Sequence, residues 1–389
     1  MAVAVFSNAQ RDFVAATQSD AGYLAWESAA LANIYPQDVF DLCGRRHVAM
    51  RRSSPSAFAA SRSGRAAFRF DDLVKVREYQ AHAEQYNQEV ADYLAVMTQA
   101  GGPVRFPDRL GYAVLQYHFD GIQPFVEVGL TRYRDTIASG FRLQNELYRQ
   151  SRIVRPERVW TPLREGMGLV ENKLAVFQTG QQAFHPALGV QALVVIVRNG
   201  VPGVVLMTRS MHLAARPGWL QFPPSGGMEF FGNDPENISS DLISQSDPGL
   251  SLCRELMEEL FAAEESETDW ELFDSLVVSE FGTRLETAFE DGSADVRFLG
   301  VVADAMTGRP ELSFLIVARE VDWEIRQSEE SRVVPSLESF PNLAALLADP
   351  AVHLCPSSAG LLRLAIDSGA LVEAEVLSDD VGSALFGKG

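Results

Sequence analysis

Cysteine and long apolar runs are scarce in this chain of 389 residues. Its three cysteines, Cys43, Cys253 and Cys355, are scattered and odd in number, so they fit neither a disulfide framework nor a zinc-binding spacing. The chain has no run of about 18 apolar residues, which argues against a transmembrane helix. The first residues also lack the basic segment of a secretory signal. We therefore expect a protein of the reducing cytoplasm, without a membrane partner.

Positive charge is scarce as well. The formal net charge is −19, from 33 basic and 52 acidic residues. Because binding to nucleic acids and anionic membranes is driven by basic surface, this balance argues against both kinds of partner. Residues 44–70 oppose the trend, with seven arginines and no acidic residue. This segment favours a solvated loop, and the alternative is an electropositive arm that binds phosphates.

Length and composition indicate a folded protein of two domains. The sequence is 47% hydrophobic and 22% charged, as is usual for globular proteins. Arginines crowd a short connector just before Trp160, and we place the domain boundary near residue 160. We expect an N-terminal α+β domain over 1–160, a second α/β domain over 161–370 and a C-terminal tail over 371–389.

Apolar periodicity predicts the elements of the N-terminal half. Helices are expected over residues 9–33, 71–99 and 135–150, and strands over 112–119 and 124–133. The helix over 71–99 would carry an apolar stripe, which can form a homodimer interface or pack against its own domain. His82, His118, Cys43 and Asp120 are the only candidates for catalysis in this half, and they share no recognised spacing.

The second half begins with strands. Residues 190–197 are almost continuously apolar and rich in β-branched side chains, which predicts a buried strand. Asn199-Gly200 then predicts a hairpin with a strand over 204–207. Further strands are expected over 298–302 and 312–317, and a helix over 357–368.

The most informative stretch lies between these strands and reads Arg254-Glu255-Leu256-Met257-Glu258-Glu259. A helix here places the three glutamates on one face, because residues three and four apart are neighbours on a helix. Like charges this close repel each other, and a hard divalent cation bound by carboxylate oxygens removes the repulsion. Asp247-Pro248 predicts the start of this helix, since Asp is a good N-cap and Pro is favoured at the first helical position.

A glycine-rich turn precedes the helix. Residues 218–227 read Gly-Trp-Leu-Gln-Phe-Pro-Pro-Ser-Gly-Gly, and paired glycines allow backbone to approach a phosphate. The turn and the helix together resemble the Nudix box, in which a glycine pair precedes Arg-Glu-apolar-x-Glu-Glu. The resemblance covers about residues 165–330. It implies an α/β fold of Nudix type, an α/β/α sandwich around a mixed sheet.

The resemblance also implies an activity, the metal-dependent hydrolysis of a nucleoside diphosphate linked to another group. Glu255, Glu258 and Glu259 match the metal-ligand and base positions, and Arg254 matches the position that orients a glutamate. Gly226 matches the glycine whose backbone helps to hold the metal. The implied cofactor is Mg²⁺ or Mn²⁺, and the implied partner is a small nucleotide or diphosphate.

Residues near the turn are candidates for substrate binding. Gly226 and Gly227 can approach the diphosphate through their backbone, and Arg216 can contact the leaving phosphate, since Arg binds phosphate bidentately. Phe230 and Phe231 follow the turn in a place that normally faces solvent. We expect them to contact the N-terminal domain.

The box also departs from the family pattern. Asn233 stands where the family has a glutamate, an insertion follows it, and Phe261 stands where the family has a glycine. Glu236, or the later Glu280 or Glu286, can supply a further carboxylate. The departures motivate an alternative function, a non-hydrolytic nucleotide-binding sensor or regulatory module on a Nudix fold.

Overall fold

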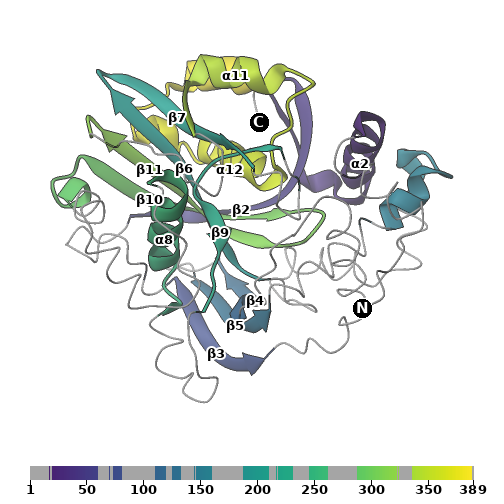
Figure 1. Ribbon diagram of the computed structural model, residues 1–389, viewed down its shortest axis with the longest axis horizontal. Coiled ribbons are helices and arrows are strands. Elements are labelled where there is room, and N and C mark those ends of the chain that lie inside the picture. Colours follow the sequence, from purple (N-terminus) through teal and green to yellow (C-terminus); the bar gives the residue numbers. More distant parts are fainter. Residues whose placement is uncertain are drawn as a thin grey trace, which may run out of the picture.

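Figure 1 shows the computed structural model of the chain. The structure describes residues 17, 20–59, 70, 73–80, 110–119, 125–132, 144, 146–159, 187–209, 216, 218–230, 245–261, 287–321, 323 and 335–387.

A nine-stranded mixed sheet organises this part of the chain. Its main path runs β1 (Val39–Leu42), β2 (Arg45–Ala59), β10 (Ala294–Asp304), β11 (Pro310–Arg319), β6 (Gly189–Arg198), β7 (Val201–Thr208) and β12 (Ser336–Ser339). Two short strands lie off this path: β8 (Leu220–Gln221) pairs with β7, and β9 (Ser225–Gly227) pairs with β6. β11 and β6 are parallel, and the other pairs of this sheet are antiparallel.

Helices cover both faces of the sheet. Successive residues of a strand point to opposite faces, and along β6 Val194 joins one apolar core while Val195 joins another. The first core includes α8 (Pro248–Leu260), and the second includes α11 (Phe340–Ala348) and α12 (Pro356–Asp367). Figure 1 shows α8 and α12 on either side of the sheet. The α/β fold class with helices around a mixed sheet is therefore confirmed.

A second, three-stranded sheet lies next to the glycine turn. It has the order β3 (Val74–Gln80), β5 (Phe125–Arg132), β4 (Leu110–His118). The backbone N–H of Tyr112 in β4 donates to the carbonyl of Met228 at 3.1 Å, and the N–H of Phe230 donates to the carbonyl of Leu110 at 2.8 Å. Phe230 is buried in one core with residues of this sheet, so its expected contact with the N-terminal part is confirmed. Phe231 lies outside the described residues.

The remaining N-terminal elements pack at one end of the large sheet. Helix α2 (Ala21–Ile34) is capped by Asp20 and is followed by the short helix η1 (Pro36–Asp38). A separate core joins α2 to β2, to residues before and after η4 (Pro156–Arg158) and to the turn after β10. Of the helix expected over 9–33, residues 21–33 belong to α2, whereas Asp20 is extended and caps it, so the expected helix is not continuous.

Three sequence-based expectations differ from the structure. The arginine-rich segment is not a loop where it is described, because Arg45–Ala59 forms β2. Arg51 in it stacks on Phe40, with the guanidinium carbon 4.2 Å from the ring centre, and pairs with Asp367 at 3.2 Å. Part of the helix expected over 71–99 is strand β3, and its other residues lie outside the described ranges.

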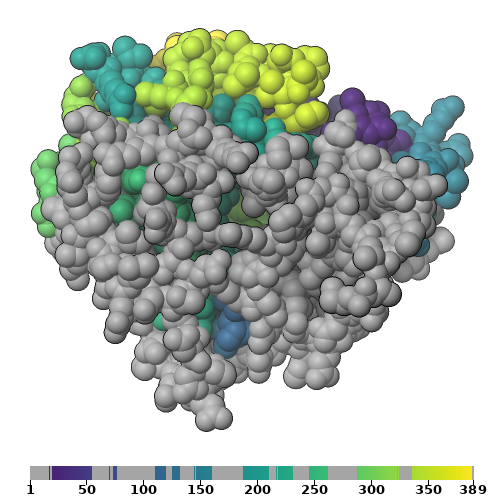
Figure 2. All heavy atoms as spheres, viewed as in Figure 1, coloured from purple at the N-terminus to yellow at the C-terminus, as the bar shows by residue number. Residues whose placement is uncertain are grey.

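The third difference concerns the C-terminus. In place of a tail over 371–389, the chain forms α13 (Ala370–Glu373) and α14 (Asp379–Phe386). Phe386 is fully buried and lies 6.2 Å from Phe340, measured between ring centres. In Figure 2 the yellow-green C-terminal part gathers along one edge of the molecule.

Strands from both sides of residue 160 belong to the large sheet, since β2 pairs with β10. Segments from before and after the expected boundary therefore contribute strands to one sheet. The division into domains stays a prediction. The three cysteines are free thiols. Among the described helices, none is long and apolar enough to cross a membrane.

Candidate functional site

The glutamate helix α8 begins where the sequence predicts. Asp247 is its N-cap, and the side chain accepts a hydrogen bond from the N–H of Gly249 at 2.8 Å, with Pro248 in the first helical position. Leu252, Leu256 and Leu260 are fully buried in the core beneath the sheet. Packing of this apolar face fixes the rotation of the helix, and the glutamates lie toward the glycine turn.

Arg254 ties two of the glutamates to that turn. Its Nη2 donates to Glu255 Oε1 at 2.5 Å and to the carbonyl oxygen of Gly227 at 2.7 Å. Its Nε lies 3.9 Å from Glu258 Oε1. The Glu255 side chain is 10% exposed and that of Glu258 is 20% exposed. Glu258 is therefore the more accessible of the two carboxylates.

Gly226 lies directly against the Glu255 carboxylate. A Cβ atom added at Gly226 would stand 1.9 to 2.1 Å from the carboxylate atoms of Glu255, so only glycine fits there. Gly226 and Gly227 form β9 and pair with Val190 and Gly189 of β6. The sheet thus holds the glycine backbone in place against the helix.

Glu259 is held by the sheet rather than by Arg254. The N–H of Ser225 donates to Glu259 Oε2 at 2.9 Å, and the side-chain amide of Gln221 donates to Glu259 Oε1 at 3.3 Å. Burial, together with the nearby Glu255 carboxylate, raises the pKa of Glu259 well above its usual range. Burial also raises the pKa of Glu255, against the opposing effect of Arg254.

Two further charged residues lie close to this group. A Cβ at Gly189 would stand 2.7 Å from the Gly226 carbonyl oxygen, 2.8 Å from Arg309 Nη2 and 3.2 Å from Glu311 Cγ. Burial raises the pKa of Glu311 to about 6. Sequence reasoning missed both residues, although a glutamate inside an otherwise apolar strand is a sign of a buried charge with partners.

Carboxylates outnumber guanidiniums around the glycine turn. The carboxylates of Glu229, Glu255, Glu258, Glu259 and Glu311 interact with the guanidiniums of Arg209, Arg254 and Arg309. Burial raises the pKa of Glu255, Glu259 and Glu311, because buried charges that are not compensated are costly. A divalent cation can compensate such a group of carboxylates in place of protons.

The donor set fits a hard divalent cation. Carboxylate oxygens and a backbone carbonyl are ligands that Mg²⁺ and Mn²⁺ prefer, and Gly226 provides a close backbone approach beside Glu255. Within the described ranges, no three His, Cys, Asp or Glu side chains already surround one metal position. Binding of a cation would therefore need rotation of glutamate side chains, with Arg254 giving up part of its contacts.

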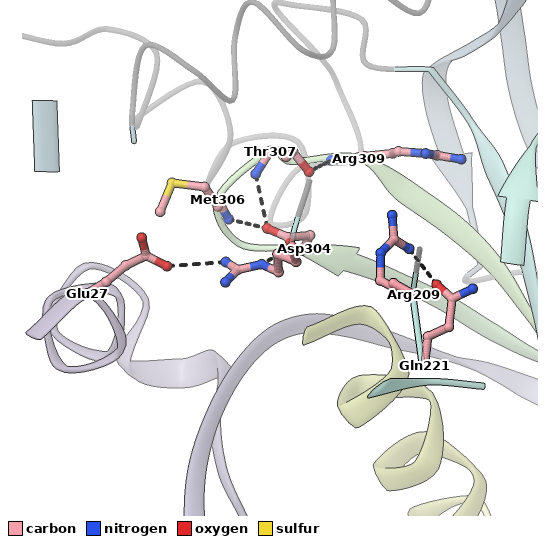
Figure 3. A network of polar contacts seen from close by, with 8 residues as sticks. Glu27, Arg209, Gln221, Asp304, Met306, Thr307 and Arg309 are labelled. Carbon is pink, nitrogen blue, oxygen red and sulfur yellow. Dashed lines mark hydrogen bonds and ion pairs between the residues drawn. The ribbon is translucent and has the colours of Figure 1, made fainter. Parts of the chain in front are cut away.

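Arg216, the arginine expected to bind substrate, has partners away from the glutamate helix. Its Nη2 lies 3.2 Å from Glu27 Oε1 of α2, and its Nε lies 3.8 Å from Asp304 Oδ2 of β10. The guanidinium carbon also stacks 4.4 Å above the Trp219 ring. Figure 3 shows Glu27 and Asp304 in the same network of polar contacts. Contact between Arg216 and a substrate stays a prediction, and Asn233, Glu236, Glu280 and Glu286 lie outside the described residues.

Comparisons with known proteins find only distant similarities. No family model matches the chain, and no curated protein matches it. Among solved structures it is similar to a Nudix hydrolase from Alicyclobacillus acidocaldarius, with 14% identity and a TM-score of 0.30 over 49% of this chain and 96% of that chain.

It is also similar to a bifunctional NMN adenylyltransferase/ADP ribose pyrophosphatase from Francisella tularensis complexed with AMP and Mn ion, with 12% identity and a TM-score of 0.27 over 63% of this chain and 64% of that chain. A second structure of that enzyme gives 11% identity and a TM-score of 0.28 over 76% and 69% of the two chains. All three TM-scores are below 0.5, so nothing about the activity of this chain is inferred from these structures.

Proposed function

We propose that this protein hydrolyses the diphosphate of a nucleoside diphosphate linked to another group. Glu255, Glu258 and Glu259, with the carbonyl of Gly226, would hold Mg²⁺ or Mn²⁺. The observation that carries the proposal is the contact between Gly226 and the Glu255 carboxylate, where a single Cβ would fill the space between turn and helix. A helix face that only packs in the core or faces solvent does not require the backbone of Gly226 to lie this close to a buried carboxylate.

The metal would neutralise the diphosphate and lower the pKa of a bound water. Neighbouring residues of the chain orient the carboxylates that would bind this metal. Arg254 fixes Glu255 against the turn, and the Ser225 N–H and the Gln221 amide fix Glu259. Glu258 is more exposed than Glu255, and in this proposal it would receive the proton from the attacking water.

The test is hydrolysis of a panel of nucleotide sugars and dinucleotides with Mg²⁺ by wild type, Glu258→Gln and Glu259→Gln. Each substitution removes one charge and keeps the side-chain shape, and we expect turnover to fall by about 100-fold or more, since general bases and metal ligands contribute at this scale. Glu157→Gln, at an exposed glutamate in η4, is the control. Unchanged turnover in both site variants would reject the assignment.

A second function is favoured by the position of Arg254. Because its guanidinium already pairs with Glu255 and Glu258, the site can remain closed to metal and bind a nucleotide without cleaving it. Phe261 supports this alternative, since the family's glycine is replaced by a buried ring that packs on Trp323, 5.8 Å away between ring centres. Calorimetry with the nucleotide panel separates the two functions: tight binding in the absence of metal, without turnover in its presence, supports a sensor.

A further inference from the structure

Gln221 is a buried glutamine whose amide contacts two charged residues of the site. It lies in β8 and is 2% exposed. Its Nε2 donates to Glu259 Oε1 at 3.3 Å and lies 3.5 Å from the sulfur of Met207. Its Oε1 accepts a hydrogen bond from the guanidinium of Arg209, the contact drawn in Figure 3. The amide therefore bridges a carboxylate and a guanidinium.

These neighbours dictate the orientation of the amide. An arginine side chain can only donate hydrogen bonds, so the Arg209 guanidinium needs the amide oxygen as its acceptor. A flipped amide would place its NH₂ group against Arg209, and that contact would be repulsive. Buried polar groups without partners are costly, so Gln221 has one favourable orientation and little freedom.

The same contacts distinguish Glu259 from the other glutamates of α8. Glu255 pairs directly with an arginine, whereas Glu259 receives one bond from a neutral amide and one from the Ser225 backbone. Neutral donors fix the direction of the Glu259 carboxyl group without forming an ion pair with it, so its oxygens remain available to a cation. The Gln221 amide joins this carboxyl group to the Arg209 guanidinium.

We infer that Gln221 is a positioning residue of the proposed hydrolase site, whose amide fixes the Glu259 carboxylate and the Arg209 guanidinium relative to each other. The inference rests on the proposed function, because it assigns Gln221 a part in holding a glutamate that would bind the metal. Residues that orient metal ligands typically change metal affinity or activity by about 10- to 100-fold when they are replaced.

The experiment compares Gln221→Leu with Gln191→Leu. Gln191 is the matched control, because it is also a buried glutamine of the sheet, is 0% exposed, and donates to Ser313 Oγ at 2.9 Å and not to α8. Mn²⁺ affinity is measured by calorimetry without substrate, and kcat and KM are measured with the best substrate of the panel. Gln221→Glu is the second variant, since it keeps size and polarity and can still accept from Arg209.

We expect Gln221→Leu and Gln221→Glu to weaken Mn²⁺ binding and to lower kcat, each by about tenfold or more, with KM changed less than about twofold. Gln191→Leu should lower the thermal stability by an amount similar to that of Gln221→Leu and leave Mn²⁺ affinity and kcat near those of wild type. Should Gln221→Leu fail to fold, the Gln221→Glu variant carries the test.

Two results would overturn the inference in distinguishable ways. If wild type binds Mn²⁺ and hydrolyses substrate, and the Gln221 variants match Gln191→Leu in both, Gln221 has only a structural role and the proposed function stands. If wild type neither binds Mn²⁺ nor hydrolyses any substrate, the proposed function fails and the positioning role fails with it.

Discussion

The carboxylate of Asp247 accepts a hydrogen bond from the backbone N–H of Phe70, 3.2 Å away. The same oxygen caps α8 by accepting from the N–H of Gly249. One side chain therefore joins the start of the glutamate helix to a residue far before it in the sequence. The helix that carries the candidate site is anchored both by its own sheet and by the N-terminal part of the chain.

Asp247→Ala should destabilise the protein by about 1–2 kcal/mol or slightly more, because an N-cap substitution costs this much and the Phe70 N–H also loses its acceptor. Urea denaturation measures the change in the free energy of unfolding. Asp20→Ala is the control, since Asp20 caps α2 through the N–H of Tyr23. An Asp247 variant that loses less stability than the Asp20 variant would contradict the double role.

Gly226→Ala should abolish activity, because the added Cβ would stand about 2 Å from the Glu255 carboxylate, with 1.9 Å as the shortest contact. The backbone or the carboxylate must shift, and we expect turnover to fall by about 100-fold, since small displacements at a site have effects of this size. Gly382→Ala is the control. Its Cβ would meet only the flexible side chain of Leu377 at 3.2 Å, so normal turnover is expected there. Wild-type turnover in Gly226→Ala would show that the close approach has no part in catalysis.

Arg216→Met should destabilise the protein by about 3–5 kcal/mol, the cost of leaving a buried partner charge uncompensated. The Glu27 side chain is only 3% exposed, and Arg216 also forms an ion pair with Asp304. Adding Glu27→Gln to this variant should restore part of the loss. Stability is read from urea denaturation at neutral pH.

The control for this prediction is Arg297→Met. Arg297 likewise pairs with two acidic residues, Asp295 at 2.8 Å and Glu373 at 3.4 Å, but its partners are more exposed. Exposed pairs contribute about 0–1 kcal/mol. Equal losses in the two arginine variants would mean that the Arg216 network is no more important than a surface pair.

Glu311 should make the metal-free protein less stable as the pH rises. Burial raises its pKa from 4.5 to about 6, so the folded state binds this proton more tightly than the unfolded state. The resulting stabilisation is fully present below about pH 4.5 and is lost as the pH rises through about 6. The contribution is about 2 kcal/mol, since each pKa unit corresponds to about 1.4 kcal/mol.

Glu311→Gln should therefore flatten the pH dependence of the unfolding free energy between about pH 4.5 and 7, measured by urea denaturation in the presence of a chelator. Glu375→Gln, at an exposed position, serves as the control and should retain the wild-type slope. An unchanged slope in Glu311→Gln would show that this carboxyl does not titrate in that range.

The sequence predicts those parts of the fold that have local signals. Asp247-Pro248 marks the start of α8, and the β-branched run with Asn199-Gly200 marks the β6–β7 hairpin. β2 lacks such a signal. Its arginines read as a solvated loop because their partners, such as Asp367 for Arg51, come from a helix more than three hundred residues away.

The candidate site shows the same limit. The spacing of Glu255, Glu258 and Glu259 gives their common helix face. Gln221 lies within the glycine-rich segment 218–227, but nothing in the sequence singles out Gln221 or Glu311 as part of a site. Their contacts depend on strand pairing, because β8 pairs with β7, and β9 and β11 both pair with β6. Contacts that depend on strand order become visible only in three dimensions.

The most direct test is a crystal structure of the protein with Mn²⁺ and a non-hydrolysable diphosphate nucleotide, with the metal located by its anomalous scattering. The account predicts a Mn²⁺ peak bound by Glu255, Glu258, Glu259 and the carbonyl of Gly226, next to the diphosphate. Density for the nucleotide with no metal at these oxygens, or a metal bound elsewhere, would contradict the proposed hydrolase.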